Sequence, residues 1–357
     1  RAAHLINKGL TGDRTRVERG LAGHLCRCTG YNRIVDAIQT AGEAHREGPE
    51  GVEGPPRRPH HFGEDYGFER NADKPVEDGV GSSCERYRGR DQTLGVKDFV
   101  ADMTIDGMLH GSLVLSDHPR ARVTKIDPSK AAEMPGVERI LTAEDIPGVC
   151  NHGLIVHDWP LLVAEGETTR YIGDVLAVVV ADTQHRARNA AAAVKIEYQA
   201  LDPITSPQAA VAIDAPLIHP AGNLLEVCAF SRGDCDAALA ESAFVVEETF
   251  RTQRIEHAFL EPEAGLASPS EPGGLKVWSQ GQGVHEDQLQ IAAILGIDRE
   301  RIEVELVSNG GAFGGKEDLS VQGHAALAAW LMQKPVRVVL TREQSLRIHP
   351  KRHPITL

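Results

Sequence analysis

The sequence predicts an α+β protein of several domains, and three observations support this class. Residues 1–46 show helical periodicity, residues 47–90 show no periodicity, and strand-like and helix-like segments alternate from there to the end. The 357 residues are enough for two or three domains with a large core. We therefore expect a helical region (1–46), a linker rich in proline and glycine (47–90), and two α/β regions (91–204 and 216–357).

The helical region contains two amphipathic segments joined by a short loop. Val17 and Leu21 lie four residues apart on one face of the first segment, and Gly23 is a suitable residue to end it. After the loop, the second segment places Ile34, Ile38 and Ala41 on one apolar face.

The first α/β region contains two strand–helix–strand patterns. In the first pattern, a short helix ending at Pro135-Gly136 precedes a strand at Val137–Leu141. In the second, an unbroken apolar run at Val175–Ala181 predicts a buried strand, and Thr183 opens an alanine-rich helix. An alternating strand follows at 194–201, at the spacing of a crossover between parallel strands of one sheet.

The second α/β region begins with a strand at 275–280 and a helix at 284–297. The segment 301–308 alternates as a strand, with Ile302, Val304 and Leu306 on one face. A glycine-rich loop leads into an apolar helix at 320–332, and a further strand follows at 334–343.

Composition narrows the possible functions. The chain is 41% hydrophobic and 25% charged, as in ordinary globular proteins, and its formal charge of −13 argues against a nucleic-acid-binding role. No run of 18 apolar residues and no signal peptide is present, so we expect a cytoplasmic protein with no membrane association. Six cysteines are too few for a disulfide scaffold, and we expect Cys84, Cys150, Cys228 and Cys235 to be reduced thiols.

The glycine-rich loop has the sequence GGAFGGKE, from Gly310 to Glu317. A loop of this kind between a strand and a helix lets backbone N–H groups approach an anion. Its spacing matches the start of a phosphate-binding P-loop, but Glu317 stands where a P-loop needs serine or threonine to hold Mg²⁺. A tight turn alone would not require four glycines around Phe313. The loop is therefore expected to receive a flat ligand close to the backbone.

The loop between the two helical segments carries Cys26 and Cys28, one residue apart. Sites built from cysteine thiolates need four ligands, and no second pair stands nearby. The residues alone leave three possibilities open, namely half of an iron–sulfur site, half of a zinc site, or two free thiols.

Several motifs resemble one family, the molybdenum hydroxylases that include xanthine dehydrogenases and aldehyde oxidoreductases. LAGHLCRCTGY resembles the family's all-helical [2Fe–2S] domain, and GGAFGGKE resembles its molybdenum-cofactor loop. Residues 116–148 and 173–198 resemble its hammerhead α/β domain, and RIEHAFLEPEAG resembles a segment that lines the active-site region. The resemblance implies the end of a [2Fe–2S] domain at 1–46, a hammerhead-like domain at 91–204 and the start of a molybdopterin-binding domain at 216–357.

The resemblance also implies cofactors and partners. Cys26 and Cys28 would supply two of the four thiolates of a [2Fe–2S] cluster, and an upstream Cys-x-x-Cys pair, expected before Arg1, would supply the others. The family's catalytic glutamate would lie beyond Leu357, so we expect a fragment that is inactive alone. No flavin domain interrupts the chain, an architecture that resembles both the flavin-free single-chain aldehyde oxidoreductases and the selenium-dependent xanthine dehydrogenases. The detailed motifs resemble the latter more closely, which implies that FAD lies on a separate subunit. An oligomer is possible.

The implied reaction is hydroxylation of an electron-poor ring carbon of a purine, with oxygen from water and with electrons leaving through the pterin and the clusters. In this family, the carboxyl at the position of Glu317 contacts the substrate ring; as an alternative, Glu317 is a first-turn residue of the next helix. The resemblance also implies a glutamine whose amide lies near the metal. The motif around it, Trp-Ser-Gln, indicates Gln280, whereas the number of residues to the glycine-rich loop indicates Gln282, and both remain open. The residues expected to lie against the cofactor are Gly311, Ala312, Phe313, Gly314 and Gly315, where a glycine N–H can approach the cofactor closely.

Three acidic or imidazole side chains, His257, Glu261 and Glu263, lie in the segment that resembles a pocket wall, and we expect structural roles for them. Two alternatives remain for the whole protein. One is a hydroxylase of aldehydes or other aromatic heterocycles with the same cofactors. The other is an electron-transfer module that uses the iron–sulfur domain alone.

Overall fold

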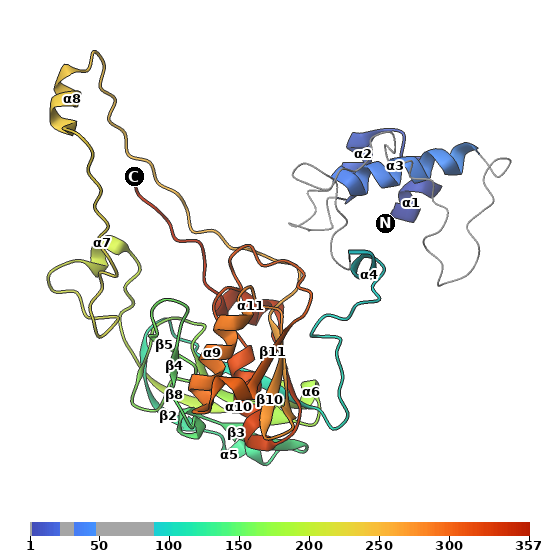
Figure 1. Ribbon diagram of the computed structural model, residues 1–357, viewed down its shortest axis with the longest axis vertical. Coiled ribbons are helices and arrows are strands. Elements are labelled where there is room, and N and C mark those ends of the chain that lie inside the picture. The colour runs from blue at the N-terminus through green and yellow to red at the C-terminus, as the bar shows by residue number, and fades with distance from the viewer. Residues whose placement is uncertain (1, 22–31, 48–88) are drawn as a thin grey trace. The chain divides into compact units, whose positions relative to one another are not determined.

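The computed structural model describes residues 2–21, 32–47 and 89–357, and it divides into two compact units (Figure 1). One unit comprises residues 1–99 with 259–261 and 308–311, and the second comprises 100–258, 262–307 and 312–357. Cys26, Cys28, Cys84 and nearly all of the predicted linker lie outside the described residues. No helix in the described ranges is long and apolar enough to cross a membrane.

The N-terminal helices are α1 (Ala2–Asn7), α2 (Arg14–Leu21) and α3 (Asn32–Glu47), and a short α4 (Gly89–Thr93) follows later in the chain. A small apolar cluster joins the first three, because each contributes side chains at helical spacing. The cluster consists of Leu5, Val17, Leu21, Val35 and Ile38.

The apolar face of α3 differs from the predicted one. Ile34 and Ala41 are exposed, and the buried positions are Val35, Ile38 and Gly42. The helix is rotated so that Gly42 faces its neighbours, because a Cβ at this position would overlap the side chain of Thr11. A glycine contact, which the apolar pattern does not record, thus selects the buried face.

Seven strands form the main sheet in the order β11-β10-β9-β12-β1-β7-β3. Both predicted α/β regions contribute to it, since β1 and β12 pair in parallel with Leu109 opposite Val336. Strands from both sides of the predicted boundary at 204–216 are therefore hydrogen-bonded in one sheet. The domain boundary itself stays a prediction. The strands are β1 (Leu109–Leu115), β3 (Val137–Leu141), β7 (Val175–Ala181), β9 (Ala264–Ser270), β10 (Gly274–Ser279), β11 (Ile302–Leu306) and β12 (Val336–Val339).

The element types predicted for the first α/β region are confirmed, but the crossover is wrong. β7, α6 (Gln184–Ala191) and β8 (Lys195–Ala200) form in that order, and the Thr183 hydroxyl accepts the Arg186 N–H as an N-cap. However, β7 is buried at every position inside the main sheet, whereas β8 exposes most of its residues and pairs antiparallel with β2 (Ala121–Asp127). A half-exposed strand suits a small second sheet, which β6 (Thr168–Thr169) completes.

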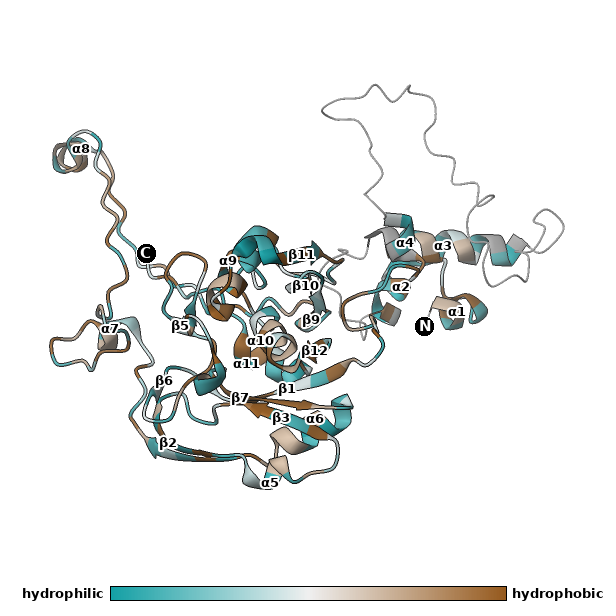
Figure 2. Cartoon of the chain, turned by 60° about the horizontal axis from the view of Figure 1, so that its bottom comes forward, coloured by the Kyte–Doolittle hydropathy of each residue, from teal (hydrophilic) through white to brown (hydrophobic). Residues whose placement is uncertain are grey.

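The main core lies between the seven-stranded sheet and helices α9 (Val284–Leu295) and α10 (Gln322–Met332). Helix α10 is buried at Gln322–Ala329, which explains its nearly uniform apolar sequence. The apolar colour of β7 in Figure 2 has the same cause. The remaining elements are α5 (Ser129–Ala132), β4 (Asn151–His152), β5 (Trp159–Pro160), α7 (Pro207–Ala210), α8 (Cys235–Glu241), α11 (Arg342–Ile348) and 3₁₀ turns at 143–145 and 299–301.

The apolar face predicted for β11 is wrong at its end. Ile302 is buried and Val304 half-buried, but Leu306 is 57% exposed. The strand lies at the edge of the sheet, where β10 is its one neighbouring strand.

Residues 211–250 are almost all exposed and contain α8 as their regular element (Figure 1). The following segment returns to the C-terminal residues through two antiparallel bridges, Arg251–Thr356 and Ile255–Arg352. These bridges bring residues 251–258 beside the segment that follows α11.

Candidate functional site

The glycine-rich loop connects β11 to α10 through an unusual backbone. Gly311, Phe313 and Gly314 have positive φ angles of 102°, 55° and 83°. Phe313 is the costly member of this set, because a side chain makes the left-handed region unfavourable. Its ring is nevertheless 47% exposed, so burial of the ring does not repay that cost. Strain of this kind, held by the surrounding structure, is typical of ligand sites.

Most N–H groups of the loop are already bonded within the protein. The Gly314 N–H donates to Gln282 Oε1 at 3.1 Å, and the Gly315 N–H donates to the Ala312 carbonyl at 2.9 Å. The N–H groups of Ala312 and Phe313 make no hydrogen bond within the described part of the chain. The donors that can serve a ligand are therefore those of Ala312 and Phe313, rather than the Gly314 amide.

The structure separates the two candidate glutamines. Gln280 is 1% exposed, and both ends of its amide are used: Nε2 donates to the Pro262 carbonyl at 3.0 Å and Oε1 accepts from Lys316 Nζ. Gln282 is exposed and uses only Oε1, which accepts from Gly314 and from the Lys316 N–H at 3.4 Å. Gln282 thus follows the loop and keeps its amide nitrogen toward solvent, while Gln280 is an internal connection.

Lys316 is the lysine of the GGKE motif, and it is buried with 1% exposure. Its ammonium group donates to Gln280, and its carbonyl accepts the Gln282 N–H at 2.9 Å. A buried charge is costly unless polar groups surround it. The Lys316 side chain therefore connects the loop to the residues that follow β10. Its ammonium group points into the protein and does not face an anion at the surface.

A buried network fixes the turn that carries Gln280 and Gln282. The Ser279 hydroxyl donates to Asp287 Oδ2 at 2.6 Å and accepts from the Gly281 N–H and Gln322 Nε2, each at 2.9 Å. One donor and two acceptor sites are all that a hydroxyl offers, so Ser279 is fully used. Burial raises the pKa of Asp287 to about 6, against the lowering effect of the Ser279 hydrogen bond. We call Ser279, Gly281, Asp287 and Gln322 the Ser279 network.

Glu317 is exposed and precedes the first residue of α10, Gln322, by a turn. The alternative that Glu317 is a first-turn helix residue is therefore wrong. Gly314 marks an open position in front of it. A Cβ placed on Gly314 would meet only Glu317 Oε1 at 3.9 Å and His257 Nε2 at 4.0 Å. The space over Gly314 is thus bordered by two titratable side chains.

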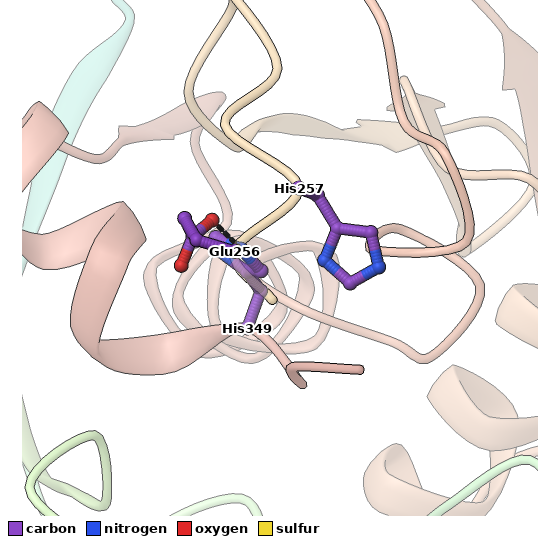
Figure 3. A group of neighbouring side chains, drawn as sticks. All are labelled: Glu256, His257 and His349. Carbon is purple, nitrogen blue, oxygen red and sulfur yellow. Dashed lines mark hydrogen bonds and ion pairs between the residues drawn. The ribbon is translucent and has the colours of Figure 1, made fainter. Parts of the chain in front are cut away.

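Beside this space, His349 lies between two carboxylates. Its Nε2 is 2.6 Å from Glu256 Oε1, and its Nδ1 is 3.1 Å from Glu263 Oε1. The side chains of His349 and Glu263 have no exposed area, and Lys351 Nζ lies 3.0 Å from Glu256 Oε2. Figure 3 shows the ring of His349 close to the Glu256 carboxylate, with His257 nearby. We call Glu256, Glu263, His349 and Lys351 the His349 clasp.

The clasp also has the residue types of a metal site. Ligand atoms of Glu256, His257 and His349 all lie within 4.8 Å of one another. Two contacts argue against a metal ion at this position. The Lys351 ammonium already neutralises Glu256, and the 2.6 Å contact of His349 with Glu256 leaves no room for an ion between the two.

The sequence predicted Gln282, Phe313, Gly314 and Glu317 as site residues, and the structure brings these four together. Cys26 and Cys28 cannot be placed, because they lie outside the described residues. Of the supporting residues, the sequence placed Glu263 in a segment with an expected structural role but missed Asp287, Gln322 and His349. Asp287 gave no local signal because polar residues surround it in α9, and His349 gave none because Glu256 is 93 residues away.

Comparison with known proteins identifies the domains of the chain. Residues 218–357 match the model of the molybdopterin cofactor-binding domain, and residues 94–202 match the a/b hammerhead domain of aldehyde oxidase and xanthine dehydrogenase. Residues 1–39 match a [2Fe–2S] binding domain.

Individual relatives agree with these models. The large molybdopterin subunit of nicotinate dehydrogenase from Eubacterium barkeri is 38% identical over 278 residues, which cover 78% of this chain and 65% of the relative. A probable xanthine dehydrogenase subunit from Bacillus subtilis is 35% identical over 272 residues, covering 76% of this chain and 36% of the relative. The aldehyde oxidoreductase of Desulfovibrio gigas superposes with a TM-score of 0.83 at 26% identity, over 99% of this chain and 39% of that one.

The matched domains thus combine an iron–sulfur domain and a molybdenum-cofactor domain in one polypeptide, and both are domains for redox cofactors. The chain belongs to the molybdenum hydroxylase family of xanthine dehydrogenases and aldehyde oxidoreductases, whose members are oxidoreductases. It spans about a third to two thirds of the length of the two curated relatives described above.

Proposed function

We propose that this chain forms one wall of the active site of a molybdenum hydroxylase that acts on a purine or a related heterocycle. One observation carries the proposal most directly. Gln282, Phe313 and Glu317 meet at a single strained loop, where two backbone N–H groups and one amide nitrogen are available to a ligand. The open position over Gly314 fits a group that must approach the backbone closely.

The residues suggest a division of roles. The Ala312 and Phe313 N–H groups and Gln282 Nε2 would donate hydrogen bonds to oxygen atoms of the molybdenum cofactor. When bound, the cofactor supplies transfer of water-derived oxygen to the substrate carbon and accepts two electrons. Glu317 would hold the substrate ring and exchange a hydrogen bond or a proton with a ring nitrogen as charge develops there.

Electron transfer is the second part of the proposal. Cys26 and Cys28 would provide two of the four thiolates that a [2Fe–2S] cluster needs, because each iron takes two protein sulfurs besides the bridging sulfides. FAD would sit on a separate subunit. The support is that two relatives are themselves named as subunits of larger dehydrogenases.

The substrate class has one close competitor. The Desulfovibrio gigas protein is an aldehyde oxidoreductase, and it superposes over almost the whole of this chain. Xanthine and nicotinate dehydrogenases among the relatives, together with the carboxyl of Glu317, favour a nitrogen heterocycle. A terminal selenium ligand on the metal, as in selenium-dependent xanthine dehydrogenases, is part of the same proposal, and elemental analysis tests it directly.

The test uses the native full-length protein with its partner subunits. We expect molybdenum, iron and hydroxylation of xanthine or nicotinate with label from H₂¹⁸O. Replacement Glu317→Gln should lower kcat/KM for the heterocycle by about a hundredfold, because it removes the proton-exchanging group. Benzaldehyde turnover, which needs no ring-nitrogen contact, is the matched comparison. A protein with clusters but no molybdenum would support the electron-transfer module, and equal losses on both substrates would favour the aldehyde hydroxylase.

A further inference from the structure

The open position over Gly314 has a second polar border besides Glu317. His257 Nε2 lies 4.0 Å from the point where a Gly314 Cβ would stand, nearly the same separation as Glu317 Oε1 at 3.9 Å. A flat ring above Gly314 would therefore meet an imidazole on one edge and a carboxyl on another. An imidazole nitrogen can donate or accept a hydrogen bond, depending on its tautomer.

The backbone around His257 is held in an unfavourable conformation. Ala258, the next residue, has a φ of 49°, which is rare for a residue with a side chain. The Ala258 N–H donates to Glu256 Oε1 at 3.1 Å, so the carboxylate of Glu256 closes the turn that carries His257. Burial acts to raise the pKa of Glu256, but the Ala258 N–H, Lys351 and His349 outweigh it and the net pKa is lowered. An observed outlier of this kind marks a place where the protein maintains a particular side-chain direction.

In the His349 clasp, His349 contacts the residues on both sides of this turn, Glu256 and Glu263. The ring nitrogens of His349 lie 2.6 Å from Glu256 Oε1 and 3.1 Å from Glu263 Oε1. The contact with Glu256 is a hydrogen bond, whereas the contact with Glu263 is a close polar contact without hydrogen-bond geometry. The charged and titratable groups facing the ring are Glu256, Glu263, Lys351 and His257, whose ring centre lies 5.7 Å from that of His349. The clasp therefore joins the end of α11 to residues 256–263 and fixes the turn that directs His257.

From this geometry we propose that His257 is a specificity-determining residue, which hydrogen-bonds a ring nitrogen or ring carbonyl of a heteroaromatic substrate opposite Glu317. His349, Glu256 and Glu263 are positioning residues that act through it. The inference rests on the proposed function and deepens it, because it requires two polar edges on the substrate. An aldehyde with a plain hydrocarbon ring offers no partner to His257.

The experiment compares variants of the full-length holoenzyme on two substrates. His257→Phe keeps a flat ring but removes the hydrogen bond, whereas His257→Gln keeps a polar atom near the position of Nε2. His185→Gln, an exposed histidine on α6, is the control. We expect His257→Phe to lower kcat/KM for the heterocycle at least about tenfold, mainly through KM, because a polar substrate group loses its partner. His257→Gln should recover most of this loss, and benzaldehyde kinetics should match those of the wild type.

A second measurement tests the positioning role. In Glu263→Gln, the heterocycle KM should rise while benzaldehyde kinetics stay unchanged, because the variant alters the buried contact with His349 that holds the segment carrying His257.

Four outcomes would overturn the inference. If the wild type turns over the heterocycle and His257→Phe does so equally well, the role of His257 is contradicted while the proposed function stands. An equal loss on both substrates has the same meaning. A divalent ion that copurifies with the wild type and is lost in His257→Phe would make the cluster a metal site. A holoenzyme that hydroxylates benzaldehyde but no heterocycle contradicts the proposed function as well, so the two failures are distinguishable.

Discussion

Two buried carboxylates support two different segments beside the candidate site, and they do so with different partners. Asp287, in the Ser279 network, is 1% exposed and has a neutral hydroxyl as its partner. Glu263, in the His349 clasp, is fully buried and faces an imidazole that a second carboxylate also contacts. Burial alone makes the neutral acid the favoured form, which is why the pKa of Asp287 rises to about 6. The comparison shows that what a buried carboxylate contributes depends on its partner, and it predicts opposite responses to neutral substitutions.

The largest effect should come from removing the shared partner in the clasp. His349→Ala leaves Glu263 buried without the imidazole and removes one of the partners of Glu256 Oε1, which still accepts the Ala258 N–H. We expect the free energy of unfolding to fall by about 3–5 kcal/mol, the usual cost of breaking a buried ion pair from one side. Urea unfolding of the variant measures this change. A loss below about 1 kcal/mol would show that the contacts of His349 with the two carboxylates contribute little to stability.

Neutralising Asp287, the carboxylate of the Ser279 network, should raise the free energy of unfolding above pH 6, in contrast to the loss expected for His349→Ala. The folded-state pKa of Asp287, about 6, lies above its ordinary value of 3.8, so the folded protein binds the extra proton between these values. The free energy of unfolding contributed by this group therefore falls as pH rises from about 4 to 6 and stays low above that range, by about 3 kcal/mol for two pKa units. Asp287→Asn keeps an acceptor for Ser279 and should remove that pH dependence.

The measurement is urea unfolding of wild type and Asp287→Asn at intervals from pH 4 to 8. The two should have similar stability near pH 4, and the variant should be the more stable above pH 6. If the variant is less stable at every pH, the carboxylate is needed as a charged partner, and the contrast with the clasp fails.

The smallest effect concerns the far end of the helix that carries the clasp. The Thr341 side chain caps α11 by accepting the Gln344 N–H at 3.2 Å, and Gln344 Oε1 accepts the Thr341 N–H at 3.0 Å. Thr341→Ala should cost about 1 kcal/mol, as for other N-caps. It should leave the heterocycle KM of the holoenzyme unchanged, because the clasp fixes the other end of the helix. A rise in that KM would mean that the cap, and not the carboxylates, positions the ring.

Local patterns predicted the regular elements well. The apolar run at Val175–Ala181, the cap at Thr183 and the strand at Val137–Leu141 are all present, because each is encoded by residues within a few positions of one another. The predicted crossover failed for the same reason. Which sheet receives β8 depends on the half-exposed surface of β2, some seventy residues earlier in the chain.

The candidate site divides along the same line. The GGAFGGKE motif placed Phe313, Gly314 and Glu317 in one loop, since four glycines in a short segment indicate close approach whatever the surroundings. The choice between Gln280 and Gln282 could not be made from the chain alone. It depends on a hydrogen bond between residues 32 positions apart and on the burial of Lys316.

By itself, the sequence determined the element types, the family motifs and the glycine-rich loop, because these depend on side chains that are neighbours in the chain. Only the tertiary structure decided that strands of both α/β regions share one sheet, that Lys316 points inward and that His349 meets Glu256 and Glu263. The physical reason is that buried charge and hydrogen-bond satisfaction are settled by whichever groups the folded chain brings together. A pattern of neighbouring residues contains no record of those partners.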